Sequence, residues 1–159
     1  MPRMYTVIFE SVAISAAQDL FQIKGAAGKQ VEIARIKIGA TDTTQPTSQQ
    51  MSWRARFLPA TVTDGGGSSV TPQPIDHGDA AASFTAIANS TSKASTSGTA
   101  SILYEGGDHI FNGLDETWDG ILVARPQVGP SESIVVELLS TVSGTVHLSG
   151  TIWCVERGG

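Results

Sequence analysis

An excess of β-branched residues is the feature that most limits what this chain can fold into. The sequence contains 16 Thr, 13 Ile and 12 Val but only 8 Leu. Branching at Cβ restricts side-chain rotamers in a helix and suits the pleated surface of a sheet. Gly and Ser, with 17 residues each, gather in short stretches between the apolar runs, as turns between strands do. The composition therefore predicts an all-β protein with many turns.

Alternation of apolar and polar residues locates the strands. It is cleanest over residues 51–58, where the apolar residues of one parity are Met51, Trp53, Ala55 and Phe57. Arg54 and Arg56 occupy the other parity, so one side of this strand is expected to be buried and the other polar. We expect further strands over residues 5–14, 19–24, 31–38, 83–88, 99–105, 109–114, 120–124, 133–139 and 145–156.

Three segments leave room for more than one interpretation. Residues 15–23 fit either a short helix or a turn followed by a strand, and we favour the strand. The apolar parity changes within residues 31–38, which predicts either burial on both faces or a bulge near Ala34. The Gly106–Gly107 pair is expected to turn the chain between two strands.

The whole chain, residues 1–159, is predicted to form one domain, an antiparallel β-sandwich of jelly-roll type. Its strands recur at the spacing of about 8–12 residues that is typical of sandwiches and barrels. Residues 61–79 contain a glycine triplet and two prolines, and they form the longest irregular segment. We interpret this segment as a long surface loop and not as a domain boundary, because neither half of the chain has a self-sufficient set of strands.

Charge and cysteine content restrict the possible environments and partners. The formal net charge is −5 and only 16% of residues are charged, which argues against direct nucleic-acid binding. No apolar run approaches the roughly 18 residues of a membrane span, and the first ten residues do not resemble a secretory signal. Cys154 is the single cysteine, so no disulfide can form within the chain, and its apolar flanks predict a small buried side chain.

No motif for catalysis or cofactor binding occurs in the sequence. The nucleophile-elbow and phosphate-loop patterns are both absent. Asp76, His77 and Asp79 with His109 would be the only metal set to imagine, and their spacing does not support it. His147 falls on the expected outer parity of the last strand, where we expect it to face solvent. We therefore predict no catalytic residues, no metal ligands and no cofactor, and we expect that the protein is not an enzyme.

Three segments together resemble a group of small proteins encoded among the head genes of tailed bacteriophages and prophages. They are FESVAISAAQDLFQI (9–23), PQPIDHGDAAASFTA (72–86) and LSGTIWCVE (148–156). That group is similar in size and strand content to capsid decoration, or head cement, proteins. The resemblance implies a virion structural protein that binds where major capsid subunits meet, as a homotrimer. It also implies a place on the capsid surface, with the host cytoplasm as the site of assembly.

Six residues are candidates for an interface with such partners. Arg54 and Arg56 share a polar strand face, where arginine is either solvated or engaged in docking. Trp118 lies among acidic residues, where it would suit a solvated turn or a sugar-binding platform. The others belong to the second segment of the resemblance: Pro72, Pro74 and Ile75.

A second hypothesis remains open beside capsid decoration. The protein would then be a tail-fibre or carbohydrate-binding module with sugars stacked on Trp53, Trp118 or Trp153. Exposure of these three indoles separates the two hypotheses, because a buried indole cannot stack on a ligand.

Overall fold

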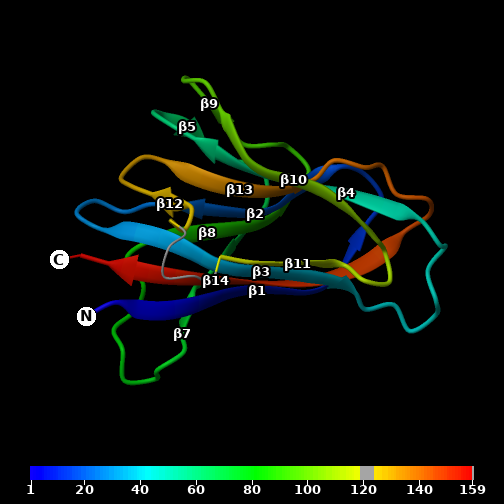
Figure 1. The fold of residues 1–159 in the computed structure, drawn as a ribbon, viewed down its shortest axis with the longest axis horizontal. Helices are drawn as coiled ribbons and strands as arrows, with labels where there is room; N and C mark the ends of the chain where they lie inside the picture. Colours follow the sequence, from blue (N-terminus) through cyan, green and yellow to red (C-terminus); the bar gives the residue numbers. More distant parts are fainter. Residues whose placement is uncertain (119–123, 159) are drawn as a thin grey trace.

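The computed structural model describes residues 1–118 and 124–158, and every regular element in them is a β-strand. Figure 1 shows the strands stacked in layers, with both chain termini at one end. The prediction of an all-β protein built from antiparallel sheets is confirmed. The strands are β1 (Arg3–Ile14), β2 (Gln18–Lys24), β3 (Gln30–Ala40), β4 (Gln50–Leu58), β5 (Val62–Thr63), β6 (Ser68–Val70), β7 (Gln73–Pro74), β8 (Thr85–Ser90), β9 (Ser95–Thr96), β10 (Ser101–His109), β11 (Leu114–Thr117), β12 (Gln127–Val128), β13 (Ser133–Leu138) and β14 (Val146–Arg157).

Two main sheets pack against each other. Sheet A has the order β11-β3-β14-β1-β7, with β12 also paired to β3, and sheet B has the order β10-β4-β13-β2-β8-β6. Strands β5 and β9 form a separate two-stranded sheet. The long strands pair in a nested way, because β1 pairs with β14, β2 with β13, β3 with β11 and β4 with β10.

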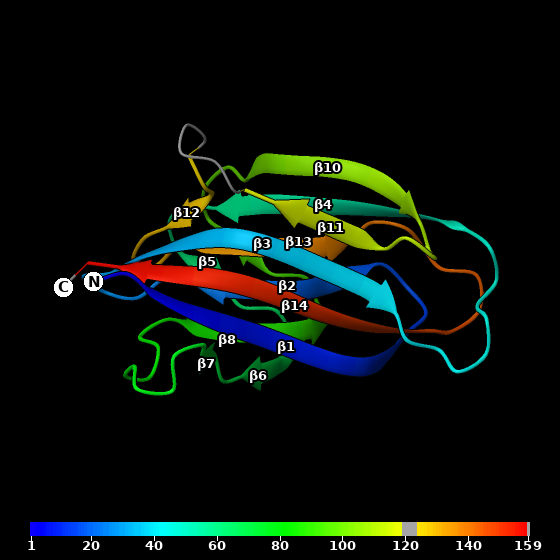
Figure 2. The same cartoon turned by 60° about the horizontal axis from the view of Figure 1, so that its bottom comes forward.

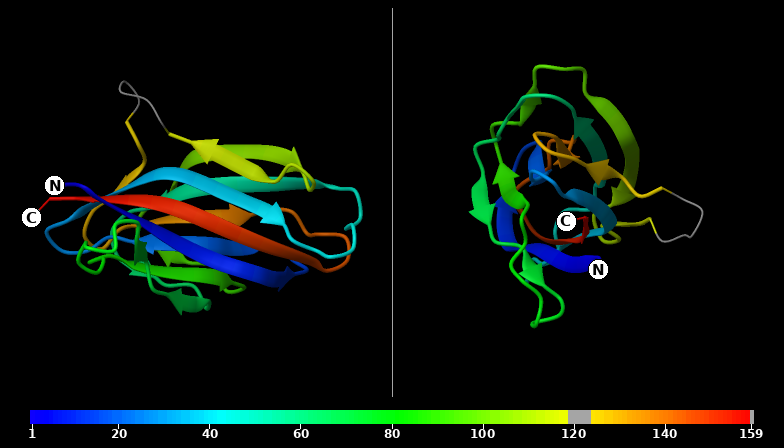
Figure 3. Two further views of the ribbon diagram at one scale, coloured as in Figure 1. Left: turned by 90° about the horizontal axis from the view of Figure 1, so that it is seen from below. Right: turned by 90° about the vertical axis from the view of Figure 1, so that its left-hand side faces the viewer.

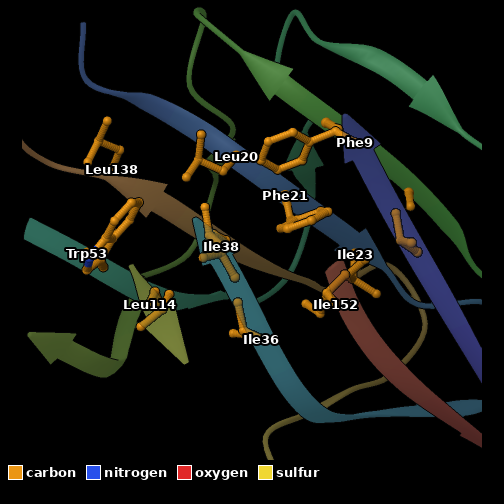
Figure 4. Close-up of a cluster of buried hydrophobic side chains, with 14 of the residues drawn as sticks. Phe9, Leu20, Phe21, Ile23, Ile36, Ile38, Trp53, Leu114, Leu138 and Ile152 are labelled. Atoms are coloured by element: carbon orange, nitrogen blue, oxygen red, sulfur yellow. The ribbon is translucent and has the colours of Figure 1, made fainter. Parts of the chain in front are cut away.

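The core lies between the inner faces of the two sheets. Figure 4 shows apolar side chains from both sheets meeting there, with the Phe9 and Phe21 rings 5.0 Å apart. Trp53 is fully buried from β4, and the alternation predicted for this strand is confirmed at Met51 and Ala55 as well. Because the inner positions of both sheets are almost entirely apolar, their burial drives the packing of the two layers.

Two of the open sequence interpretations are decided by the register of the strands. On β14, Trp153 lies opposite Arg35 and Cys154 lies opposite Ile33, so Ala34 is an extra residue in β3. The predicted bulge near Ala34 is therefore confirmed, and the bulged carbonyl accepts a hydrogen bond from the Trp118 amide at 2.9 Å. Residues 18–24 form a strand and not a helix.

The prediction that Gly106 and Gly107 turn the chain is wrong. Strand β10 continues through both glycines to His109, opposite Trp53 and Ser52 of β4. A Cβ on Gly106 would lie 2.5 Å from the hydroxyl oxygen of Tyr104, so this glycine makes room for a tyrosine side chain within the strand. The turn comes later, at residues 110–113, which replaces most of the strand predicted over 109–114.

The segment 61–79 is less irregular than predicted. It contains β5, β6 and β7, of which β6 pairs with β8 and β7 pairs with β1. These short strands extend both sheets at their edges (Figure 2). Residues 120–123 of the strand predicted over 120–124 lie outside the described part of the chain. Ala124 is described and is not in a strand.

Two glycines on neighbouring strands of sheet A give a matched test of the core. A Cβ on Gly150 would lie 2.6 Å from the Phe9 ring, whereas a Cβ on Gly39 would meet no atom within 4 Å. We expect Gly150→Ala to lower the free energy of unfolding by about 1–3 kcal/mol, because it overpacks the core. Gly39→Ala is expected to change it by no more than about 0.5 kcal/mol. Urea unfolding measures both values, and equal effects would contradict this packing.

Candidate interaction surface

The chain itself covers the outer face of sheet B. The residues around β5 and β9 lie over this face, where Val62 and Ala94 pack on Leu58 and Val135 to form a small second apolar cluster. The Gly65 amide donates a hydrogen bond of 3.1 Å to Oε1 of Gln22 on β2. This cover buries the central part of the outer face of sheet B, whereas Ile102 on the edge strand β10 stays exposed.

A buried ion network lies beneath the cover. The Glu137 carboxylate is fully buried on β13, where it accepts a hydrogen bond from Nε of Arg54. Nε of Arg56 and Nζ of Lys93 lie 3.4 and 3.3 Å from its second oxygen. Both arginines proposed as docking residues therefore hold an internal carboxylate, which stabilises a charge that would otherwise be costly to bury.

Asp19 is the second buried acid of this network. Its Oδ2 accepts a hydrogen bond of 2.7 Å from the Ala94 amide, and its Oδ1 lies 3.6 Å from Arg56. Burial raises the pKa of Asp19 to about 6, although the Ala94 amide and Arg56 act in the opposite direction. The Asp19–Ala94 hydrogen bond therefore joins the residues before β9 to β2. Burial makes the ionised form of the Asp19 side chain less stable than it is in water.

The outer face of sheet A is open. Figure 2 and the left view of Figure 3 show β3, β14 and β1 side by side with no described strand in front of them. Ile8 and Met4 of β1 are 42% and 39% exposed on this surface. Across the sheet, Ile8 lies beside Thr151, which lies beside Lys37. We call this surface the open face, and it combines apolar and charged side chains.

Trp153 and Arg35 form the aromatic part of the open face. The Arg35 guanidinium lies 5.4 Å from the centre of the Trp153 ring, and hydrogen bonds of 2.9 and 2.7 Å hold it to the Asp115 carboxylate. Arginine stacked on an indole is typical of the residues that dominate protein interfaces. A hollow of about 260 Å³ beside them is lined by Met4, Ala34, Arg35, Thr117, Arg125 and Trp153.

The structure separates the other predicted interface residues from Arg54 and Arg56. Pro72, Pro74 and Ile75 lie in or next to β7, at one edge of sheet A, and the Ile75 amide donates to the Met4 carbonyl. Trp118 follows β11 near the opposite edge and is half-buried against the core. Sequence reasoning gave Trp153 only a sugar-stacking role, although its outward parity beside Arg35 points to the open face.

Residues with possible chemistry have structural roles in the described part of the chain. Asp76 accepts a hydrogen bond from the Gly78 amide, and Nε2 of His109 lies 2.9 Å from the Ser48 hydroxyl. Burial raises the pKa of the Cys154 thiol far above its usual range. Residues 1–118 and 124–158 contain no group of three or more His, Cys, Asp or Glu side chains placed to hold a metal ion.

Comparisons with known proteins found no relative of this chain. A scan against protein-family models, a search of curated proteins and a search of solved structures each found no match for this chain. In the described residues there is no helix with the length and apolar character needed to cross a membrane.

The raised pKa of Asp19 predicts how stability depends on pH. The folded protein holds the Asp19 proton more tightly than the unfolded chain, whose aspartate pKa is about 3.9. This contribution to the free energy of unfolding is full below about pH 4 and is lost as the pH rises through about 6, a loss of about 3 kcal/mol.

Asp19→Asn keeps an acceptor for the Ala94 amide and removes this titration. Urea unfolding of both proteins between pH 4 and pH 7.5 should show the variant gaining about 3 kcal/mol relative to the natural protein as the pH rises. A difference between the two proteins that stays constant across this range would contradict the raised pKa.

Proposed function

We propose that the protein is a structural protein of the tailed-phage virion that decorates the capsid. It binds the head shell where major capsid subunits meet and clamps the seams between them, on the capsid surface. The three segments that resemble phage head proteins support this function. We further propose that it acts without catalysis, cofactor or direct contact with nucleic acid or membrane, because the function needs only a rigid shape repeated over the shell.

We also propose that the sandwich is a jelly roll. The nested pairing supports this. The first long strand, β1, pairs with the last, β14, and moving inward along the chain β2 pairs with β13, β3 with β11 and β4 with β10. A chain folded back on itself in this order and wrapped into two sheets has the connectivity of two Greek keys. Jelly rolls occur in capsid and lectin domains, so the topology agrees with the proposal by analogy.

The difference between the two outer faces carries the proposal. The chain covers sheet B with its own residues but leaves the face with Met4, Ile8 and Trp153 open. Exposed apolar side chains grouped with a stacked arginine fit a surface that docks on another protein. Symmetry repeats this contact many times over a shell, so each single contact needs only modest affinity.

One observation supports the alternative function as a tail-fibre or carbohydrate-binding module. Trp53 is fully buried and cannot stack on a sugar, but Trp153 and Trp118 are half-buried. A carbohydrate-binding module would use the half-buried indole of Trp153, which lines the hollow of about 260 Å³ on the open face.

A homotrimer is the proposed assembly in solution. Strand β10 ends sheet B, and Ile102 is 58% exposed on it, with Leu103 bulged beside it. A free edge with apolar residues favours pairing with a neighbouring copy. Light scattering after size exclusion should give three times the 16.6 kDa chain mass at micromolar concentration. Ile102→Asp should reduce this mass, and a natural protein that stays monomeric would contradict the trimer.

Binding to capsid shells tests the decoration function. Purified protein is mixed with expanded shells of the major capsid protein encoded nearest to this chain, and co-sedimentation measures binding. We expect saturable binding of the natural protein, and an affinity about tenfold weaker or worse for Ile8→Asp, because a charge is placed on the open face.

Phe111→Asp is the matched control. Phe111 is 48% exposed, close to the exposure of Ile8, but it lies in the turn between β10 and β11 and not on the open face. Its substitution should leave the affinity within about twofold of the natural value. Equal losses for both variants would remove the open face from the contact, and no binding of the natural protein would remove the decoration function.

A further inference from the structure

A groove lined by both polar and apolar groups lies on the outer surface of sheet A and reaches the end of the sandwich far from the termini. It consists of two adjoining hollows of about 500 and 370 Å³, which share Ser11 and Thr41. Volumes of this size suit small ligands. The first hollow is lined by residues of β1, β3 and β14 together with Thr41, and the second continues over the loop that follows β3 to Asp42, Thr43, Thr44 and His147. The loop that follows β3 lies at the right of Figure 1.

Gly39 lies at the bottom of the groove and has no side chain to fill it. It stands at an outward position of β3 beside Ser149, and a Cβ there would meet no atom within 4 Å. Any larger side chain at this position would therefore project into the groove without disturbing the core.

His147 and Asp42 form a fixed pair at one end of the groove. Nδ1 of His147 lies 2.8 Å from Oδ1 of Asp42, and the His147 amide donates to the same carboxylate at 3.0 and 3.1 Å. The bond to His147 keeps the pKa of Asp42 below its usual range, so the carboxylate is ionised and Nδ1 carries the proton. In the neutral ring, Nε2 is then a hydrogen-bond acceptor with an orientation set by Asp42.

Ser11 stands at the other side of the groove in an uncommon backbone conformation. Its φ is +46°, and it forms a bulge in which Glu10 and Ser11 together face Ser149. The Ser11 amide donates to the Ser149 hydroxyl oxygen at 2.8 Å, and that oxygen lies 3.3 Å from the Thr41 hydroxyl. A strained residue that is held in place in this way is often found at a binding site.

The groups along the groove match a ligand that is rich in hydroxyls. Serine and threonine hydroxyls donate and accept, Nε2 of His147 accepts, and the Glu10 carboxylate and the Lys37 ammonium add one strong acceptor and one strong donor. Two carboxylates against one lysine disfavour an anionic ligand. Ile8 offers an apolar rim against which the C–H face of a sugar ring would pack.

We propose that this groove binds a neutral saccharide, with Ser11, Thr41, His147 and Ser149 as its hydrogen-bonding residues. Binding does not need to order these side chains and so does not carry that entropy cost, because Asp42 and the serine–threonine contacts already hold them. The inference rests on the groove alone and does not depend on the capsid contact.

Amide chemical shifts of the full chain test the proposal. The isotope-labelled protein is titrated with maltose, lactose, chitobiose and mannobiose, up to tens of millimolar each. At least one of these disaccharides should give saturable shifts at Ser11, Thr41, His147 and Ser149. Gly39→Gln should weaken that binding at least tenfold, because its side chain fills the groove.

Thr6→Gln is the matched control, since Thr6 points outward on the same face but does not line the groove. It should bind the same sugar within about twofold of the natural affinity. The proposal is overturned if none of the sugars causes saturable shifts at the groove. It is equally overturned if the shifts gather around Trp153 and survive Gly39→Gln, or if a sulfated sugar binds more tightly than its neutral counterpart. The sugar titration involves no capsid shells, so its outcome is independent of the decoration function.

Discussion

The buried carboxylate of Glu137 is the interaction on which the arrangement of this protein most depends. It lies at the centre of sheet B, between Arg54, Arg56 and Lys93. A charge buried this completely is tolerated only with its partners in place, and loss of one partner typically costs about 3–5 kcal/mol. The network therefore fixes β4 against β13, and Lys93 also joins the segment before β9 to this carboxylate.

This anchoring of a covering segment on sheet B makes the two surfaces of the sandwich different. The residues around β5 and β9 are used to cover sheet B, and Ala94 contacts both Asp19 and Arg56 there. Sheet A also holds a buried carboxylate, Glu32, which pairs with Arg125 and Arg157. The side chains of Met4 and Ile8 on its outer face nevertheless stay exposed. The outer face of sheet A therefore offers exposed apolar, aromatic and hydroxyl-bearing groups together, and the open face and the groove share Ile8, Lys37 and Thr151 there.

The sequence predicts the parts of this structure that depend on local patterns. Period-two alternation identified the strand of Trp53, and a change of parity identified the bulge at Ala34. The pattern failed at Gly106, because a glycine pair is a local turn signal while the tyrosine that needs the space is recognised only in the folded strand. Contacts such as Arg54 with Glu137 or Asp42 with His147 join residues about 80 to 105 positions apart, and no local pattern contains them.

Electron cryo-microscopy of capsid shells saturated with the protein tests the central claim most directly, because it shows which surface meets the shell. Our account predicts that β1, β3 and β14 face the capsid subunits, with Ile8 and Trp153 buried in the contact and β5 and β9 pointing outward. A map in which the covered side of sheet B lies against the shell, while the open face is turned to solvent, would contradict it.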